Sequence, residues 1–176
     1  GEWIGAKATT IFSFHPRVRE LPTEIHIQGF SSNSFGSRML AMSKPTYNSI
    51  MLHASRHDEN AVVFVPSRRQ AQLTAIDIMA YAKAIHEEDQ FLHNVNRVKD
   101  AIETRLARSS KALKIVLAQG VGFLHTGMTA RERSVVKQLY KDGSIRVLVC
   151  QKDLCWSVSD VSARFVETIT LRWLVF

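Results

Sequence analysis

The sequence is poor in cysteine and has no long apolar run. Its two cysteines, Cys150 and Cys155, lie on or just after an apolar segment, which indicates small buried thiols of a reducing compartment rather than a disulfide pair. No run of about eighteen apolar residues occurs, so we expect neither a membrane span nor a membrane partner. The N-terminus lacks the basic start and apolar core of a signal peptide, and we interpret it as a cut inside a longer protein.

The familiar catalytic and nucleotide-binding motifs are also missing. The nearest approach to a P-loop, residues 1–7, is one residue short and has no strand before it. The sequence contains no Asp-Glu-x-His/Asp box, no Gly-x-Ser-x-Gly and no Gly-x-Gly-x-x-Gly. Its seven histidines are scattered along the sequence, and we assign no metal site to them. We therefore assign no catalytic residue and no metal ligand to these residues.

Basic charge, by contrast, is in excess. Lys and Arg number 23 against 16 Asp and Glu, which gives a net charge of +7 at pH 7. Such a balance favours partners that carry phosphates, because each neutralised phosphate releases condensed counterions. A soluble basic surface without a phosphate partner explains the charge equally well. The length of 176 residues and the 45% hydrophobic content fit one globular domain.

The centre of the chain has the pattern of a strand, a helix and a second strand. The apolar run Val121–His125 is followed by Thr129 and Glu132 at the spacing of a capping box, which predicts a helix start. Gly143 stands where a helix often ends. Ile145–Val149 is almost continuously apolar, as in a strand buried on both faces. A unit of this length predicts a right-handed βαβ crossover.

The first third of the chain gives weaker signals. Residues 1–22 have no sustained period and read as an extended connector. In Thr23–Phe30, isoleucines alternate with polar residues, which predicts a half-buried strand with His26 on its solvent side. Residues 38–53 have a helical composition with Pro45 inside. Either Pro45 kinks one helix, or Ser43 caps a new one that Pro45 helps to start.

A second strand-to-helix unit follows at Ala61–Pro66, the most strand-like run of the sequence. Ser67 and Gln70 then have a second capping-box spacing. We expect the helix to bury Leu73, Ile76 and Ala80 on one face. Arg68 and Arg69 lie in its first turn, where cations oppose the helix dipole, so they either face an anion or simply reach water. Further along, Asn96–Gly120 predicts two helices separated at Ser109–Ser110, and Phe165–Ile169 predicts a last strand.

Helices between strands predict an α/β fold with a mostly parallel sheet and helices on both faces. Binding sites in such sheets lie at the carboxyl ends of the strands. Three of these ends carry polar or basic segments, which are Ser67-Arg68-Arg69, His125-Thr126-Gly127 and Gln151-Lys152-Asp153. The sequence therefore predicts that this edge of the sheet faces phosphates.

Five stretches resemble a single known family, namely Trp3–Ala6, Phe12–Phe30, Val63–Ile78, Gly120–Met128 and Leu154–Trp156. Together they resemble the second RecA-like domain of the Ski/Brr-type DExH RNA helicases of superfamily two. They most resemble the C-terminal cassette of the two-cassette spliceosomal members. The resemblance runs in order from residue 1 to about residue 166. It implies a RecA-like three-layer sandwich, with a connector over 1–22, the helicase C-terminal domain over 23–170 and a divergent tail over 171–176.

The resemblance also implies roles for the strand-end segments. Phe64–Arg68 matches motif IV, His125–Gly127 matches the His-x-Gly element, and Val147–Ser159 falls on motif V, which couples RNA to ATP. The implied RNA-binding residues are Ser67, Arg68, Arg69, His125, Thr126, Gly127, Gln151 and Lys152. The implied ATP-coupling residues are Trp156, Ser157 and Ser159.

This chain departs from the family pattern in motif V. Gln151 replaces a threonine that would donate to a phosphate, Ser157 replaces a glycine, and Ser159 replaces an asparagine. A serine adds a Cβ where the backbone needs freedom, so we expect weakened ATP coupling through this loop. The arginine-bearing motif VI is absent, and the sequence no longer follows the family after Arg164.

The resemblance leaves two functional hypotheses. The first is a domain of an ATP-dependent RNA helicase of pre-mRNA splicing, located in the nucleus and gripping RNA during unwinding of a spliceosomal RNA duplex. ATP with Mg²⁺ would then be shared with a first RecA-like domain, and further helicase domains and spliceosomal proteins would be partners. The second is a catalytically reduced cassette that serves as a protein-interaction platform.

Overall fold

The computed structural model describes residues 26–32, 34–54, 60–86, 90–158 and 164–167, together with residues 5, 12, 14, 15 and 18. The chain divides into two compact units, residues 1–30 and residues 31–176. The second unit holds all the helices and strands named below. The predicted connector and the predicted tail lie wholly or mostly outside the described residues, and so does Ser159.

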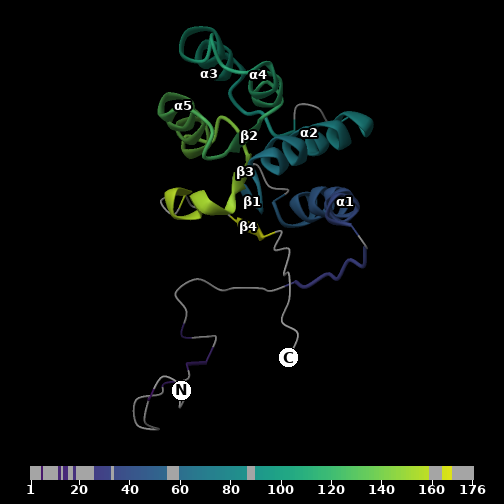
Figure 1. Ribbon diagram of the computed structural model, residues 1–176. Coiled ribbons are helices and arrows are strands. Elements are labelled where there is room, and N and C mark those ends of the chain that lie inside the picture. The colour runs from purple at the N-terminus through teal and green to yellow at the C-terminus, as the bar shows by residue number, and fades with distance from the viewer. Residues whose placement is uncertain are drawn as a thin grey trace. The chain divides into compact units, whose positions relative to one another are not determined.

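A four-stranded parallel sheet forms the centre of the second unit (Figure 1). Its strands are β1 (Ala61–Val65), β2 (Val121–Leu124), β3 (Val147–Gln151) and β4 (Arg164–Glu167). Their order in the sheet is β2-β3-β1-β4. The side chains of β2 and β3 are all buried, as the continuous apolar runs predicted. The predicted last strand is present over its first three residues, in β4.

Helices cover both faces of this sheet (Figure 1). Helices α1 (Phe35–His53) and α2 (Arg68–Ala84) lie on one side, and α5 (Ala130–Lys141) lies on the other. Beyond β2 stand α3 (Val95–Asp100), the π-helix η4 (Ala101–Arg105) and α4 (Lys111–Leu117), while the 3₁₀ helix η5 (Lys152–Val158) follows β3. The layers confirm the predicted α/β RecA-like fold. Among the described residues, no helix has the length and hydropathy to cross a bilayer.

Local capping signals formed as their spacing predicted. Thr129 accepts a hydrogen bond from the Glu132 amide, and the Glu132 carboxylate accepts one from the Thr129 amide at 2.8 Å, a complete capping box. Ser110 caps α4, which confirms the break at Ser109–Ser110. Ser67 caps α2 in the same way, but the Gln70 side chain donates to Thr74 instead of completing the box.

The predicted apolar face of α2 is wrong. Leu73 and Ile76 are 41% and 36% exposed, and Ala80 is exposed as well. The helix instead buries a second stripe of the same period, made of Ala71, Ala75, Ile78 and Ala82. Small residues let the helix axis approach the sheet closely, so this stripe packs well although it is less hydrophobic. The period alone does not distinguish the two faces.

One other local prediction is corrected, and one open alternative is decided. His26–Phe30 form no strand, and Ile27 is 92% exposed. Alternation of apolar and polar residues does not by itself make a strand, because the backbone groups of a strand need partners in a neighbouring strand. In the second case α1 is one continuous helix that begins after the Ser34 cap and contains Pro45. Ser43 does not cap a new helix, since its hydroxyl donates to Met39 O and to Asp77 Oδ2.

Candidate nucleic-acid interface

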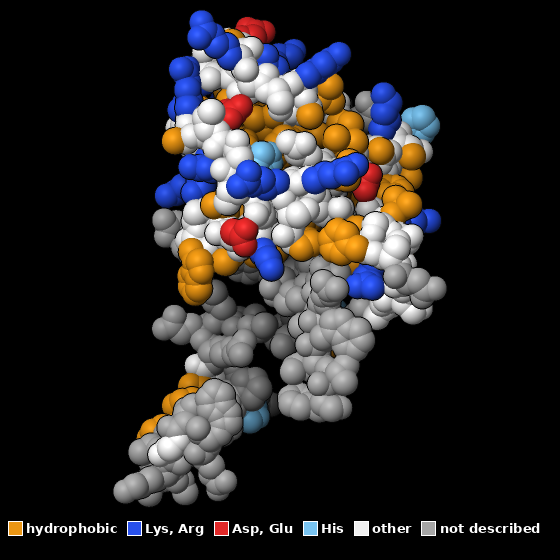
Figure 2. Space-filling model, in the orientation of Figure 1, with side chains coloured by type: hydrophobic (Ala, Val, Ile, Leu, Met, Phe, Trp, Pro, Cys, Tyr) orange, Lys and Arg blue, Asp and Glu red, His pale blue; other side chains and the backbone are white. Residues whose placement is uncertain are grey.

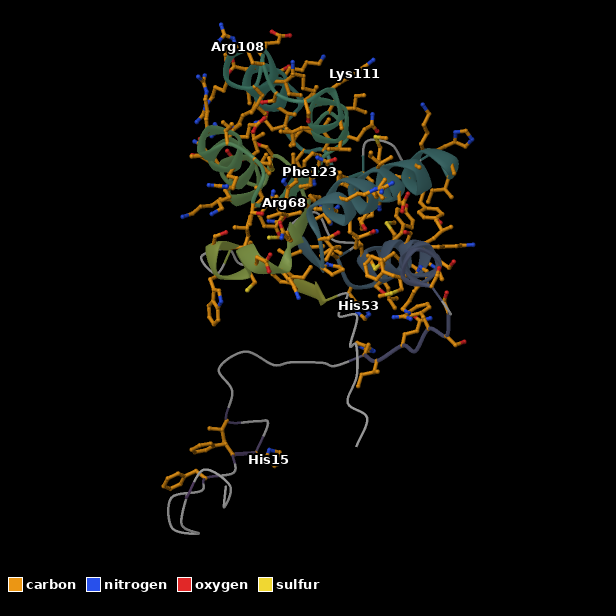
Figure 3. All side chains as sticks on the ribbon, viewed as in Figure 1. His15, His53, Arg68, Arg108, Lys111 and Phe123 are labelled. Carbon is orange, nitrogen blue, oxygen red and sulfur yellow. The ribbon has the colours of Figure 1, made fainter. Side chains whose placement is uncertain are left out.

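The strand order creates a switch point between β1 and β3. The chain leaves β1 toward β2 on one side and leaves β3 toward β4 on the other, while Val65 and Gln151 stand side by side at the carboxyl ends. Crevices at such switch points are where ligands bind to open α/β sheets. Figure 3 labels Arg68, which begins α2 directly after β1, and Phe123 of β2. The structure therefore brings the predicted strand-end segments to a single edge.

One chain of hydrogen bonds joins the three strand ends. Arg68 Nε donates to Thr126 Oγ1 at 2.6 Å. The Thr126 amide and hydroxyl both donate to Gln151 Oε1, at 3.1 and 3.2 Å. Gln151 Nε2 then donates to Asp153 Oδ2 at 2.5 Å. These bonds hold the loops after β1, β2 and β3 in a fixed relation to one another.

His125 is buried behind this chain and fixes the next residue. Its ring stacks on Phe123 with 5.7 Å between centroids and 7° between planes. The Gly127 amide donates to His125 Nδ1 at 3.1 Å, so in the neutral ring the proton is on Nε2. That Nε2 lies 3.1 Å from Gln72 Nε2, so a proton on the His125 Nε2 requires the Gln72 amide to be turned by 180° to present its oxygen as the acceptor. His125 thus positions the backbone of the loop and does not face solvent.

The loop after His125 is exposed at Gly127 and is held by a hydrogen bond from α5. A Cβ at Gly127 would lie 3.2 Å from His125 Nδ1 and 3.5 Å from Arg68 Nη1, so only glycine fits without a shift. Arg133 of α5 donates from Nη1 to Met128 O at 2.9 Å. Arg133 and Gln72 are functional neighbours that the sequence did not indicate, because both are ordinary helix residues whose partners lie in another element.

Comparison with known proteins shows which family the chain belongs to. No family model matches it. It is 43% identical over 164 residues to the "U5 small nuclear ribonucleoprotein 200 kDa helicase" of Homo sapiens, which covers 93% of this chain and 7% of the relative. It is 41% identical over 158 residues to a "DExH-box ATP-dependent RNA helicase" of Arabidopsis thaliana, covering 89% of this chain and 7% of that protein. By sequence, the chain is a domain of the Ski/Brr-type DExH helicase family.

The name of a third relative refers to a different complex. The "Activating signal cointegrator 1 complex subunit 3" of Danio rerio is 35% identical over 158 residues, which cover 90% of this chain and 10% of the relative. The helicase-family domain therefore spans only a tenth or less of the length of these three relatives. Properties of the whole relatives do not transfer directly to so short a segment.

In this helicase-family domain, Gln151 connects loops. Its side chain is buried, and both ends of its amide bond to protein atoms, the oxygen to Thr126 and the nitrogen to Asp153. Gln151 therefore bridges the loop after β2 and the start of η5.

The remaining predicted residues lie apart from this chain of bonds. Arg69 is exposed and lines a hollow between α1 and α2 together with Phe35 and Leu73. Lys152 is exposed at the start of η5, and Trp156 in the same helix is 87% exposed. The Ser157 hydroxyl donates to Leu154 O at 2.7 Å, within its own helix. Ser159 lies outside the described residues.

The burial of His125 makes the stability of the domain depend on pH. Burial lowers the pKa of His125 below its ordinary value of 6.5, and the charge of Arg68 lowers it further, whereas Glu132 acts in the opposite direction. The unfolded chain therefore binds a proton more readily, so stability is lost as pH falls through about 6.5. We expect His125→Asn, whose Oδ1 can still accept from Gly127, to show a flatter stability profile between about pH 5 and 7.

Urea denaturation at a series of pH values measures this dependence. The decisive quantity is the difference between the parent chain and the variant. His86→Asn, at an exposed position past the end of α2, is the matched control. Identical profiles for the parent chain and His125→Asn would contradict the argument.

Proposed function

We propose that the chain is the second RecA-like domain of an ATP-dependent RNA helicase that acts in pre-mRNA splicing, and that its strand-end edge grips RNA backbone phosphates. The observation that carries the proposal is the hydrogen-bonded chain from Arg68 through Thr126 to Gln151 at the switch point. The names of the relatives support a splicing helicase, with RNA and spliceosomal proteins as partners of the parent protein in the nucleus. Because those relatives are named as helicases, the platform alternative is not favoured.

The geometry suits phosphate binding that does not depend on the base sequence of the RNA. Arg68 is an exposed residue, and its Nε is held by Thr126. A guanidinium fork matches the geometry of phosphate oxygens and stays charged at any working pH. Lys152 adds a second exposed cation after β3, and Gly127 lets a backbone approach closely. Contacts of this kind position a strand and carry no information about its bases.

The nucleotide would be shared with another domain. Within the described residues, no group of three or more His, Cys, Asp or Glu side chains could hold a metal ion. The exposed Trp156 and Ser157 stand after β3, where the family couples RNA to ATP. We propose that these residues contact the nucleotide from one side, while a first RecA-like domain outside these residues holds ATP with Mg²⁺ and supplies the hydrolytic chemistry.

Arg68→Gln should weaken RNA binding by the chain about tenfold at low salt, the equivalent of one charge-assisted contact. The slope of log affinity against log salt should fall by roughly 0.7, since one phosphate contact to a single strand is lost. Fluorescence anisotropy with a labelled oligouridine at several salt concentrations measures both quantities.

Lys83→Gln is the matched control, because it removes one charge from the opposite end of the same helix. It should change the affinity by less than about twofold, as expected for a remote charge screened by salt. A parent chain whose RNA affinity does not change with salt would overturn the proposed grip. The same slope in Arg68→Gln and in Lys83→Gln would exclude Arg68 from it.

A further inference from the structure

A second group of cations lies beside the strand-end edge, where the end of η4 meets the start of α5. Arg105 of η4 donates from Nη1 to Gln138 Oε1 at 2.8 Å. Arg131 of α5 donates from Nη2 to Thr104 O at 3.5 Å. Both arginines are exposed and have further N–H groups beyond these bonds. The two helices thus present two guanidinium groups on one shared surface, which we call the insert surface.

The insert surface is continuous with the strand-end edge. The loop that leaves β2 runs from His125 directly into α5, whose first residue is Ala130. Arg133 of α5 donates a hydrogen bond to the carbonyl of Met128 in that loop. Thr126 in the same loop accepts a hydrogen bond from Arg68. An RNA strand bound at Arg68 and Gly127 would therefore reach the start of α5 next.

The charge on this part of the molecule is strongly one-sided. Residues 101–133 hold two acidic residues, Glu103 and Glu132, against six Lys and Arg, which are Arg105, Arg108, Lys111, Lys114, Arg131 and Arg133. The Glu132 carboxylate is used inside the capping box, where it accepts from the Thr129 amide and hydroxyl. Figure 2 shows Lys and Arg gathered over α3, α4 and α5, and Figure 3 places Arg108 and Lys111 there. A polyanion would be attracted to this surface.

The backbone at Arg105 is unusual. The Leu106 amide donates to Ala101 O at 3.0 Å, five residues back, and closes the π-helix η4. A π-turn is rare, and single π-turns occur frequently at functional sites. Here the wide turn ends at the arginine that contacts α5.

We infer that the RNA path continues from the strand-end edge over the start of α5 onto the insert surface, where Arg131 and Arg105 bind successive backbone phosphates. This inference rests on the proposed function, because it extends the same RNA path. Arginine forks match the oxygens of phosphates and of carboxylates alike, so the choice of RNA over an acidic protein rests on the continuity of this surface with Arg68, which an acidic protein would not need.

The first test is the double variant Arg105→Gln with Arg131→Gln in the 176-residue chain. We expect oligouridine affinity to fall at least fivefold at low salt and the salt slope to fall by roughly 1.4, from two lost phosphate contacts. The matched control is Lys44→Gln with Lys83→Gln, which removes two charges from exposed positions on α1 and α2. Circular dichroism checks that each variant is folded.

A second measurement needs no variant. Acetylation of lysines in the parent chain, with and without oligouridine, should show Lys111 protected by RNA and Lys83 unprotected. If the double variant keeps the slope of its control, or if Lys111 is acetylated equally in both conditions, the insert surface does not bind RNA and an acidic protein becomes its expected partner. In that case Arg68→Gln still weakens binding, so the proposed function stands. Loss of salt dependence in the parent chain itself would overturn both.

Discussion

Replacing Gly120 by alanine is expected to cost about 4 kcal/mol or more in the free energy of unfolding, enough to leave much of the chain unfolded. Gly120 stands just before β2 with φ +77°, a conformation that an L side chain rarely adopts. A Cβ there would overlap the backbone carbonyl of Phe91 and the amide of Leu92. Those atoms cannot withdraw easily, because Phe91 O and Gly120 O both accept from the Arg146 amide.

Gly143→Ala separates the two causes of this loss. Gly143 has a similar φ of +72°, but a Cβ there would meet no atom within 4 Å. It should therefore cost only the strain of the left-handed backbone, about 1 to 2 kcal/mol. Urea denaturation followed by circular dichroism measures both variants. Equal losses at the two positions would show that the contact with Phe91 and Leu92 is unimportant.

Phe123→Ala should cost about 3 to 5 kcal/mol, because the ring is buried in the middle of β2 and its removal leaves a cavity. The ring is also the platform on which His125 stacks. Its loss should therefore loosen the loop that holds Thr126 and Gly127, and reduce RNA affinity where the chain stays folded. Urea denaturation and oligouridine anisotropy measure the two effects.

Phe123→Leu is the control that distinguishes the effect of lost core packing from the effect of lost stacking on His125. Leucine keeps most of the buried volume, so we expect a loss below about 1.5 kcal/mol. It removes the ring face, so the imidazole proton resonances of His125 should shift by the lost ring current. If Phe123→Ala were no more destabilising than Phe123→Leu, β2 would not be packed as the structure describes.

The sequence alone predicted interactions between residues that lie close together along the chain. The capping box of Thr129 and Glu132 joins residues three positions apart, so their spacing alone predicted it, and the serine pair predicted the helix break at Ser109–Ser110. The alternation of helices and strands predicted a parallel sheet, and the continuous apolar run at Ile145–Val149 predicted a strand buried on both faces. A parallel sheet gathers the strand-end segments at one edge. The resemblance and the comparisons then agreed on the helicase family.

Only the tertiary structure decided how the candidate interface is held together. Arg68 reaches Thr126 across 58 positions, Gln72 reaches His125 across 53, and Gln151 reaches Thr126 across 25. Each of these bonds depends on the order β2-β3-β1, which no local pattern contains. The buried face of α2 was decided in the same way, because the sheet selected the alanine stripe over Leu73 and Ile76. Short-range hydrogen bonds follow from spacing, whereas the choice of partner among distant residues follows from how the layers pack.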